Sequence, residues 1–504
     1  MNLFSVAFSL FVTVLFILYY TVFRKKQWIC LLLFSMAFYA YSGIANLIFM
    51  AITGFSVFAG GIWLMHFSEK YQEIRKDKSI DRARRKEIKA AFDRKRKIIL
   101  WTIIVINFGM LAVLKYLHPL FEGFLIPLGI SFYMFISIGY LVDIYFEKYE
   151  AEKNPFRFLL FVSFFPQLIQ GPINRYDQMK EQLYGRHTLD WYRCKRALIL
   201  ILFGLLKKYA IANLLVHEIA NILDAPTEKT PGSVIVFAIL LYSAQQYADF
   251  SGGIDIVMGV AELFGIEMMP NFRQPYFSVS LGDFWRRWHI SLGTWMKDYI
   301  FYPVSMAGWM GTLKKKLKKV ASRKTATRVA MAIADLIVFA LVGVWHGLGT
   351  NYLAWGLYNG IILAISAILV DEYAVWKNKM HIDSQARYWK VISLIRTLLI
   401  VTIGWIFDCT YTAGAAGKLF IHLFEFGKTD LSVISLTTTD IAVLFVGCFV
   451  LLLVDVLHEK NLEVRQIIGT KNYWVQVVFW TIVVQMIACF GRVASAGGFM
   501  YANF

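Results

Sequence analysis

The sequence contains few cysteines, and they are not arranged in pairs. Five stand singly in a chain of 504 residues, and no C-x-x-C or Cys/His cluster is present. A zinc site or a disulfide framework would need such spacing, so we expect no bound metal. We expect these cysteines to act as small hydrophobic side chains.

Several motifs of familiar enzyme classes are also missing. The chain has no G-x-S-x-G nucleophile turn, no G-x-x-x-x-G-K-[ST] phosphate loop and no H-E-x-x-H zinc pair. No histidine is followed by aspartate at the spacing H-x-x-x-x-D, which some glycerolipid acyltransferases use. Serine-type covalent catalysis and nucleotide hydrolysis therefore lack their usual parts.

Apolar residues are abundant instead. They make up 58% of the chain, against about 45–50% in soluble domains, and roughly ten or eleven segments approach the 20-residue length of a membrane span. No soluble domain, long linker or low-complexity region is present. The sequence predicts an all-α, polytopic membrane protein forming one domain over 1–504, with N-terminal helices at 1–119, a core at 120–365 and C-terminal helices at 366–504.

The net charge of +18 is concentrated in three basic segments: Arg24 to Lys26, Glu69 to Lys97, and the acid-free run from Lys314 to Arg328. The first follows the first apolar run, which is not the order of a cleavable signal peptide. The positive-inside rule places all three in the cytoplasm and the N-terminus outside a multi-pass cell-membrane protein. Attraction to anionic lipid headgroups or to an acidic partner, such as a phosphorylated cofactor or carrier protein, would both fit. Nucleic acid is not an expected partner.

The middle of the chain, about 155–350, differs from the rest. Its apolar runs are short and broken by Pro, Gly and polar residues at 164–179, 246–255 and 269–285. Irregular backbone at membrane depth persists only where protein buries it or where it lines a cavity. We therefore expect the functional site here, with a basic loop at 69–97 outside it.

The segment 283–304 reads as one basic amphipathic helix in the plane of the membrane interface. Arg286, Arg287, Lys297 and Asp298 lie away from its apolar stripe. One inward face is formed by Trp285, Trp288, His289, Leu292, Met296 and Tyr299. From this segment alone, His289 is either a hydrogen-bonded structural histidine among aromatic rings or a catalytic group.

A second histidine, His346, ends the apolar segment "RVAMAIADLIVFALVGVWHG". Gly343 and Gly347 flank it, and small residues allow close helix packing in membranes. Ionisable groups in spans are costly and mark function by default, but a satisfied structural histidine is an equal alternative. Asp335 lies on the same face about 16 Å upstream, too far to orient His346. The two histidines are the best candidates for acid–base chemistry near pH 7.

At these residues the sequence resembles the membrane-bound O-acyltransferase family, in its bacterial branch of alginate and peptidoglycan O-acetyltransferases and teichoic-acid D-alanyltransferases. The similar segments, over about 120–365, include "FFPQLIQGPINR", "QYADFSGGIDIVMG", "DFWRRWHISLGTW" and "LVGVWHG". After "YIFYPV", this chain departs from the alginate-type pattern with "SMAGWMGTLKKKLKKVASRK".

The resemblance implies a bundle with broken, re-entrant and interfacial helices around a tunnel, and it implies that His346 and His289 are catalytic. The candidate substrate-binding residues are Trp285, Arg286, Trp288, Asp249, Ser251 and Trp345.

The function that follows is O-acyl transfer, most simply O-acetyl transfer. It would run from a cytoplasmic thioester, acetyl-CoA or an acyl carrier protein, to a hydroxyl of an extracytoplasmic glycan or to a secreted or membrane-anchored partner transferase. No cofactor is expected to stay bound. D-Alanyl transfer to teichoic acid is the alternative within the class. A proton-coupled transporter using His346 and Asp335, or a silent scaffold for a secreted transferase, are alternatives outside it, although no repeated segment of the kind that transporters show is present.

Overall fold

The computed structural model describes residues 3, 5–77, 79–117, 127–223, 230–425 and 434–490, the side chains of 486–490 excepted. Throughout these residues the regular structure is helical, and one isolated bridge between Phe272 and Trp288 is the only β-type pairing in them. The prediction of an all-α polytopic membrane protein is confirmed.

Contacts divide the described chain into two compact units. Unit 1 comprises 1–198 and 257–269, and unit 2 comprises 199–256 and the residues from 270 on. The predicted boundary between 119 and 120, and residues 491–504 of the predicted C-terminal segment, lie outside the described residues. Both candidate histidines belong to unit 2.

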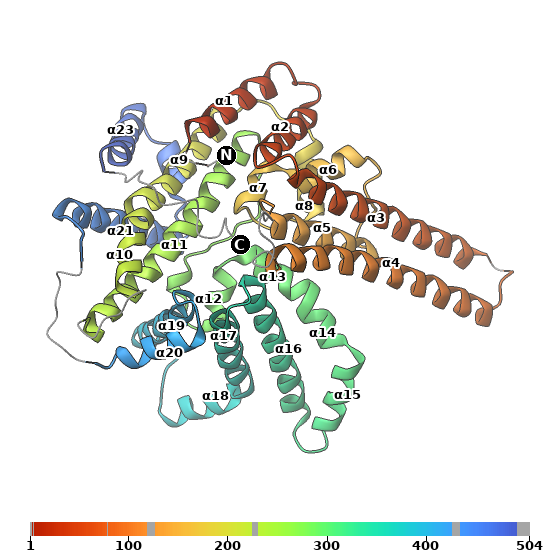
Figure 1. Ribbon diagram of the computed structural model, residues 1–504. Helices are drawn as coiled ribbons and strands as arrows, with labels where there is room; N and C mark the ends of the chain where they lie inside the picture. Colours follow the sequence, from red (N-terminus) through yellow and green to blue (C-terminus); the bar gives the residue numbers. More distant parts are fainter. Residues whose placement is uncertain are drawn as a thin grey trace. The chain divides into compact units, whose positions relative to one another are not determined.

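Unit 1 holds the N-terminal helices (Figure 1). They are α1 (Val6–Tyr20), α2 (Gln27–Tyr41), α3 (Asn46–Lys76), α4 (Arg82–Tyr116), α5 (Ile130–Tyr145), α6 (Pro155–Ser163), α7 (Phe165–Ile169) and α8 (Tyr176–Tyr184). Helix α5 is the centre of this unit, since nearly all of its side chains are buried, from Ile130 to Ile144.

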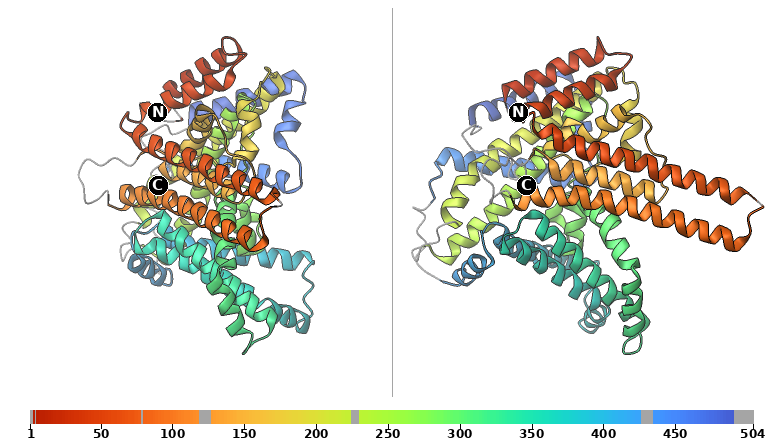
Figure 2. Two further views of the ribbon diagram at one scale, coloured as in Figure 1. Left: turned by 90° about the vertical axis from the view of Figure 1, so that its right-hand side faces the viewer. Right: turned by 45° about the vertical axis from the view of Figure 1, so that its right-hand side comes forward.

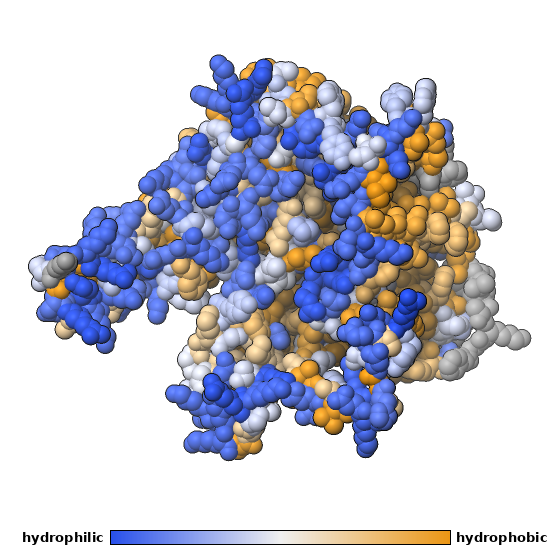
Figure 3. Space-filling view, turned by 180° about the vertical axis from the view of Figure 1, so that it is seen from behind, coloured by the Kyte–Doolittle hydropathy of each residue, from blue (hydrophilic) through white to orange (hydrophobic). Residues whose placement is uncertain are grey.

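The sequence predicted a loop at 69–97, and this prediction is wrong, because most of the segment is helical. Helices α3 and α4 continue through it and leave only residues 77–81 between them, so that they form a long antiparallel hairpin (Figures 1 and 2). Lys, Arg, Glu and Ala are strong helix formers, and Asp81 caps α4 by accepting a 2.6 Å hydrogen bond from the backbone N–H of Arg84. The tip of the hairpin is hydrophilic (Figure 3).

Unit 2 contains the remaining helices, with α9 and α11 contributing to both units. Its first part has α9 (Trp191–Lys207), the π-helix η2 (Lys208–Ala212), α10 (Asn213–Leu223), α11 (Gly232–Leu263), the 3₁₀-helix η3 (Pro275–Phe277), α12 (Leu281–Arg287), α13 (Ile290–Met296) and the π-helix η4 (Lys297–Phe301). There follow α14 (Tyr302–Met306), α15 (Gly308–Leu317), α16 (Arg323–His346), α17 (Thr350–Ile368), α18 (Val370–Lys379), α19 (Arg387–Asp408), α20 (Ala413–His422), α21 (Thr438–Glu459), α22 (Val464–Gly469) and α23 (Tyr473–Phe490).

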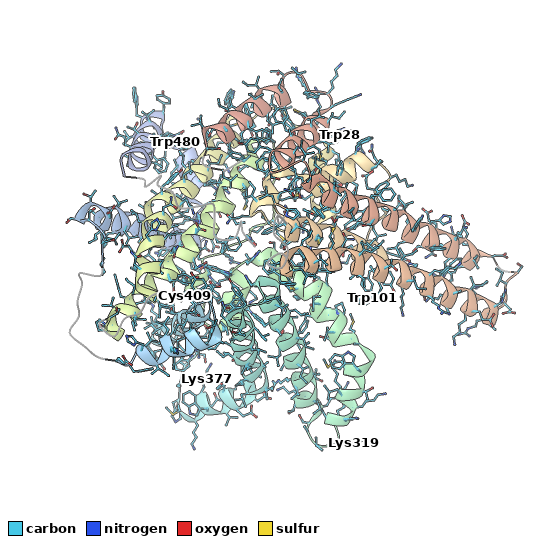
Figure 4. The ribbon with its side chains drawn as sticks, viewed as in Figure 1. Trp28, Trp101, Lys319, Lys377, Cys409 and Trp480 are labelled. Carbon is cyan, nitrogen blue, oxygen red and sulfur yellow. The ribbon has the colours of Figure 1, made fainter. Side chains whose placement is uncertain are left out.

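The basic run 314–328 also lies largely on helices, at the end of the α15–α16 hairpin. Lys319 marks this end, and Lys377 belongs to α18 (Figure 4). The broken backbone predicted at 164–179 and 269–285 is present. At 246–255 the prediction of broken backbone is wrong, because α11 runs through Gly252 and Gly253 without interruption. Gly252 lies against α9 there, and a Cβ on Gly204 would be only 2.5 Å from the Gly252 carbonyl oxygen.

Seven helices in the described residues are long and apolar enough to cross a membrane: α3, α4, α9 with η2 and α10, α16, α17, α19 and α21. Four shorter apolar helices accompany them, namely α1, α2, α5 and α23 up to Gln485, so the predicted count of spans is reached only when these are included. Large apolar side chains are exposed on the long helices, as in Phe445 at 71% and Trp101 at 61%. Exposure of this kind suits a lipid environment.

Candidate active site

The segment 283–304 is broken where the sequence predicted one helix. Helix α12 ends at Arg287, Trp288 is extended and pairs with Phe272, and His289 has left-handed backbone angles of φ 48° and ψ 52°. Helix α13 starts directly after it. Most of the predicted inward face is nevertheless buried, including His289. The break therefore turns His289 into the protein at a junction between two short helices.

Polar contacts from Asn271 fix this junction. The Asn271 side-chain oxygen lies 3.2 Å from Nδ1 of His289 and accepts hydrogen bonds from the backbone N–H and the hydroxyl of Ser291, at 3.0 and 2.9 Å. The Asn271 backbone carbonyl accepts from the N–H of Ile290 at 3.0 Å. A non-glycine residue in the left-handed region is strained, and the bonds from the backbone N–H groups of Ile290 and Ser291 to Asn271 hold His289 there.

The surroundings of the His289 ring are apolar. Phe250 contacts it edge-on, with ring centroids 4.8 Å apart, and only 5% of the residue is exposed. Burial lowers the pKa of His289 to about 3, because an apolar site disfavours the charged imidazolium. The ring is therefore neutral near pH 7, as a proton acceptor must be.

His346 is the last residue of α16, as the sequence predicted for its segment, and it is buried. The α16–α17 hairpin is packed through glycines: a Cβ on Gly343 would lie 2.5 Å from the Tyr352 carbonyl oxygen, and one on Gly356 would lie 2.3 Å from that of Phe339. Backbones this close leave no space for a larger side chain. The position of His346 is thus set by main-chain contact with the following helix.

Three aromatic rings surround His346. Their centroids lie 4.8 Å away for Trp345, 5.2 Å for Trp355 and 6.0 Å, in a stacked arrangement, for Tyr352. Two of these rings belong to α17, so the glycine contacts between the helices also decide how the imidazole is enclosed.

Ring contacts continue from His346 to the His289 junction. Trp355 packs against Trp285 (5.4 Å), Trp285 against Phe284 (5.1 Å), and Phe284 stacks on Trp288 (5.5 Å), the neighbour of His289. A 3.2 Å hydrogen bond from the Trp285 indole N–H to Asn359 anchors this series to α17. The two histidines therefore border one continuous aromatic cluster within unit 2.

The other predicted site residues lie in different environments. The Arg286 side chain is 72% exposed and pairs with Asp283, whereas its neighbour Arg287 is 18% exposed and pairs with Glu459. Asp335 is half-buried in the middle of α16.

Asp249 and Ser251 are buried on α11 and face lysines of the α9–η2 segment. Asp249 forms an ion pair with Lys208, and the Ser251 hydroxyl accepts a 3.0 Å hydrogen bond from Lys207, whose ammonium also pairs with Asp255. Sequence reasoning missed both lysines and Asn271. Two adjacent lysines inside the apolar run 197–215 were the available signal, since charges at membrane depth need partners.

These features define a polytopic helical membrane protein with two buried histidines in its irregular central part. A family model described as "MBOAT, membrane-bound O-acyltransferase family" matches residues 151–407. The chain belongs to this family, as its motifs indicated, and the matched residues include both histidines.

Three relatives illustrate the breadth of the similarity. Two are named probable alginate O-acetylase AlgI: one from Pseudomonas syringae pv. tomato is 36% identical over 327 residues (64% of this chain, 57% of the relative), and one from Pseudomonas aeruginosa is 31% identical over 469 residues (89% and 79%). A teichoic acid D-alanyltransferase from Bacillus subtilis is 28% identical over 282 residues (55% and 67%). Against several alginate relatives, the match spans only 57–61% of their own length.

Proposed function

We propose that this protein is a membrane-embedded O-acyltransferase that transfers an acetyl group from a cytoplasmic thioester, acetyl-CoA or an acyl carrier protein, to a hydroxyl of an extracytoplasmic glycan or to a partner transferase. The observation that carries this proposal is the pair of buried histidines, His346 and His289, which border one aromatic cluster inside the family-matched region. An exopolysaccharide similar to alginate is the acceptor that the alginate relatives favour.

The chemistry is direct transfer. The acceptor hydroxyl oxygen attacks the thioester carbonyl carbon, a neutral imidazole takes the hydroxyl proton, the C–S bond breaks, and the departing thiolate receives the proton. A thioester is already activated, so no covalent enzyme intermediate is required. Positioning the two reactants can supply up to about 7–11 kcal/mol, and general-base catalysis contributes about 10²–10⁴-fold.

A tunnel through the fold would bring the two substrates to the histidines from opposite sides. We place the basic ends of the α3–α4 and α15–α16 hairpins in the cytoplasm, near anionic lipids and the thioester donor, and the N-terminus outside, following the positive-inside rule. Trp285, Trp288 and Trp345 line the proposed reaction site with aromatic surface. Arg286, which is largely exposed, and Asp249 and Ser251, which face lysines, would act at its edges.

The test uses membranes containing the full-length protein, labelled acetyl-CoA and the exported glycan. We expect His346→Ala and His289→Ala to lower acetyl transfer by about 10²–10⁴-fold. His66→Ala, at an exposed position on α3, is the control and should keep full activity. Normal transfer by the His346→Ala protein would refute the assigned role.

D-Alanyl transfer is the second candidate, because a teichoic acid D-alanyltransferase is among the relatives. The same membranes supplied with a D-alanyl-loaded carrier protein distinguish the two. Labelling from this donor, and none from an acetyl donor, would replace the acetyl assignment.

A further inference from the structure

One side-chain oxygen, Oδ1 of Asn271, connects the ring of His289 to the start of α13. It lies 3.2 Å from Nδ1 of His289, and it accepts hydrogen bonds from both the N–H and the hydroxyl of Ser291. Asn271 is itself 1% exposed. The orientation of the imidazole is therefore tied to a single buried amide.

The hydrogen bonds identify which atom of the amide faces the ring. A backbone N–H can only donate, so the Asn271 atom bound by the N–H of Ser291 must be the carbonyl oxygen. The nitrogen that faces this oxygen must then carry a hydrogen, which places the ring proton on Nδ1. In a neutral imidazole, Nε2 is consequently the nitrogen with the lone pair.

Within the described residues, Nε2 of His289 is buried and makes no hydrogen bond. A buried polar atom without a partner is destabilising, and a donor on a bound reactant would satisfy it. We propose that Asn271 is a positioning residue that holds His289 in its Nδ1–H tautomer and thereby presents Nε2 as a hydrogen-bond acceptor to the acceptor hydroxyl. This inference rests on the proposed function.

The tautomer decides whether the proton can move. With the lone pair on Nε2, the hydroxyl proton passes to that atom as the new O–C bond forms and the C–S bond breaks. The imidazolium then keeps its Nδ1–H bond to Asn271 until Nε2 gives its proton to the thiolate. With the ring proton on Nε2, that nitrogen could only donate a hydrogen bond, and it could not take the hydroxyl proton.

Three variants separate this role from a structural one. Asn271→Leu removes the acceptor, whereas Asn271→Asp keeps an oxygen that faces Nδ1. Ser291→Ala is the matched control, because it removes another hydrogen bond to the same oxygen without touching the histidine. All are made in the full-length protein in lipid nanodiscs, and thermal unfolding of each checks that it folds.

Nitrogen-15 NMR of histidine-labelled protein reports the tautomer, with the His289 signals assigned by their loss in His289→Gln. We expect a protonated Nδ1 and a bare Nε2 in the wild type and in Asn271→Asp, and a mixed tautomer in Asn271→Leu. With acetyl-CoA as donor, kcat should fall at least about twofold in Asn271→Leu, in proportion to the fraction of the Nδ1–H tautomer that is lost, with the KM for acetyl-CoA unchanged. Asn271→Asp should restore part of this loss, and Ser291→Ala should stay close to wild type.

A protonated Nε2 in the wild type would overturn the proposal, and so would equal losses in Asn271→Asp and Asn271→Leu with an unchanged tautomer. If the wild type transfers no acyl group at all, the proposed function fails instead. The tautomer measurement then still decides what Asn271 does to His289.

Discussion

The ammonium nitrogen of Lys207 lies 2.7 Å from a carboxylate oxygen of Asp255, and their side chains are 5% and 18% exposed. The same ammonium donates to Ser251 and lies 4.4 Å above the centre of the Phe203 ring. A charge so removed from water is stable only with its partner present. The pair therefore joins α9 to α11, and substituting only one of the two residues should destabilise the protein.

We expect Lys207→Met and Asp255→Leu each to lower the free energy of unfolding by about 3–5 kcal/mol, because each leaves an uncompensated charge. The double variant should be more stable than either single one, since it removes both members of the ion pair. Chemical denaturation in mixed micelles measures all three. Single effects that simply add in the double variant would show that the two side chains do not depend on each other.

The buried His289 predicts a pH dependence of stability. Its folded-state pKa of about 3 is below the ordinary value of about 6.5, so between these values the unfolded chain binds more protons. Stability is then fully present above about pH 6.5 and is lost as the pH falls toward 3, by at most about 1.4 kcal/mol per pH unit.

His289→Gln has no titrating ring at this position. Its unfolding free energy should fall less than that of the wild type between pH 7.5 and pH 5.5, and parallel denaturation curves at the two pH values measure the difference. An equal fall in both proteins would mean that His289 takes up a proton in the folded state.

The arginines next to His289 form a natural matched pair. Arg287 makes two hydrogen bonds to Glu459, at 2.8 and 3.3 Å, while the largely exposed Arg286 has a 3.3 Å ion pair with Asp283. Two-point contacts of a half-buried arginine outweigh an exposed pair. We expect Arg287→Ala to cost about 1 kcal/mol of stability and Arg286→Ala less than about 0.5 kcal/mol.

Thermal unfolding in detergent compares the two variants under identical conditions. Acetyl transfer adds a second comparison: if Arg286 binds substrate, Arg286→Ala raises the KM at unchanged stability. A stable Arg286→Ala protein with wild-type kinetics would remove Arg286 from the candidate substrate-binding residues.

The sequence predicted which residues are buried more accurately than it predicted where helices break. The apolar content and the placement of charge predicted a helical membrane protein, and the spacing around His289 predicted its burial. The break between α12 and α13 was not predicted, because the spacing of apolar residues within 283–304 does not reveal a single left-handed residue. That residue, His289, is held by Asn271, which precedes it by 18 positions. Such a contact leaves no periodic signal.

At 69–97 and at the glycines of α11, the error was the reverse: the sequence predicted irregular backbone where the structure has helix. Charge and glycine are typical of irregular backbone in soluble proteins. Here helix-forming residues extend α3 and α4 instead. At Gly252, the close contact with α9 needs a helix that has no side chain at that position. Within a membrane bundle, glycine favours close packing between helices and does not indicate a break in the helix. The lysine partners of Asp249 and Ser251 required knowing which helices meet.

Close packing between α16 and α17 provides the last prediction. A side chain at Gly356 would meet the Phe339 carbonyl oxygen, 2.3 Å from the new Cβ, and backbone cannot move aside as a flexible side chain can. Gly356→Leu should therefore separate the two helices, destabilise the protein by about 1–3 kcal/mol, and move Trp355 away from His346. If His346 is the catalytic group that we propose, acetyl transfer should fall by more than the loss of folded protein explains, because the Trp355 ring next to the His346 imidazole is displaced.

Gly311→Ala is the matched control for this variant, since nothing lies within 4 Å of a Cβ at that position on α15. It should keep both stability and activity. Denaturation curves and transfer rates of the two variants, measured in the same nanodiscs, test the argument. A Gly356→Leu protein that unfolds at the wild-type midpoint and transfers acetyl at the wild-type rate would show that contact between α16 and α17 does not position His346.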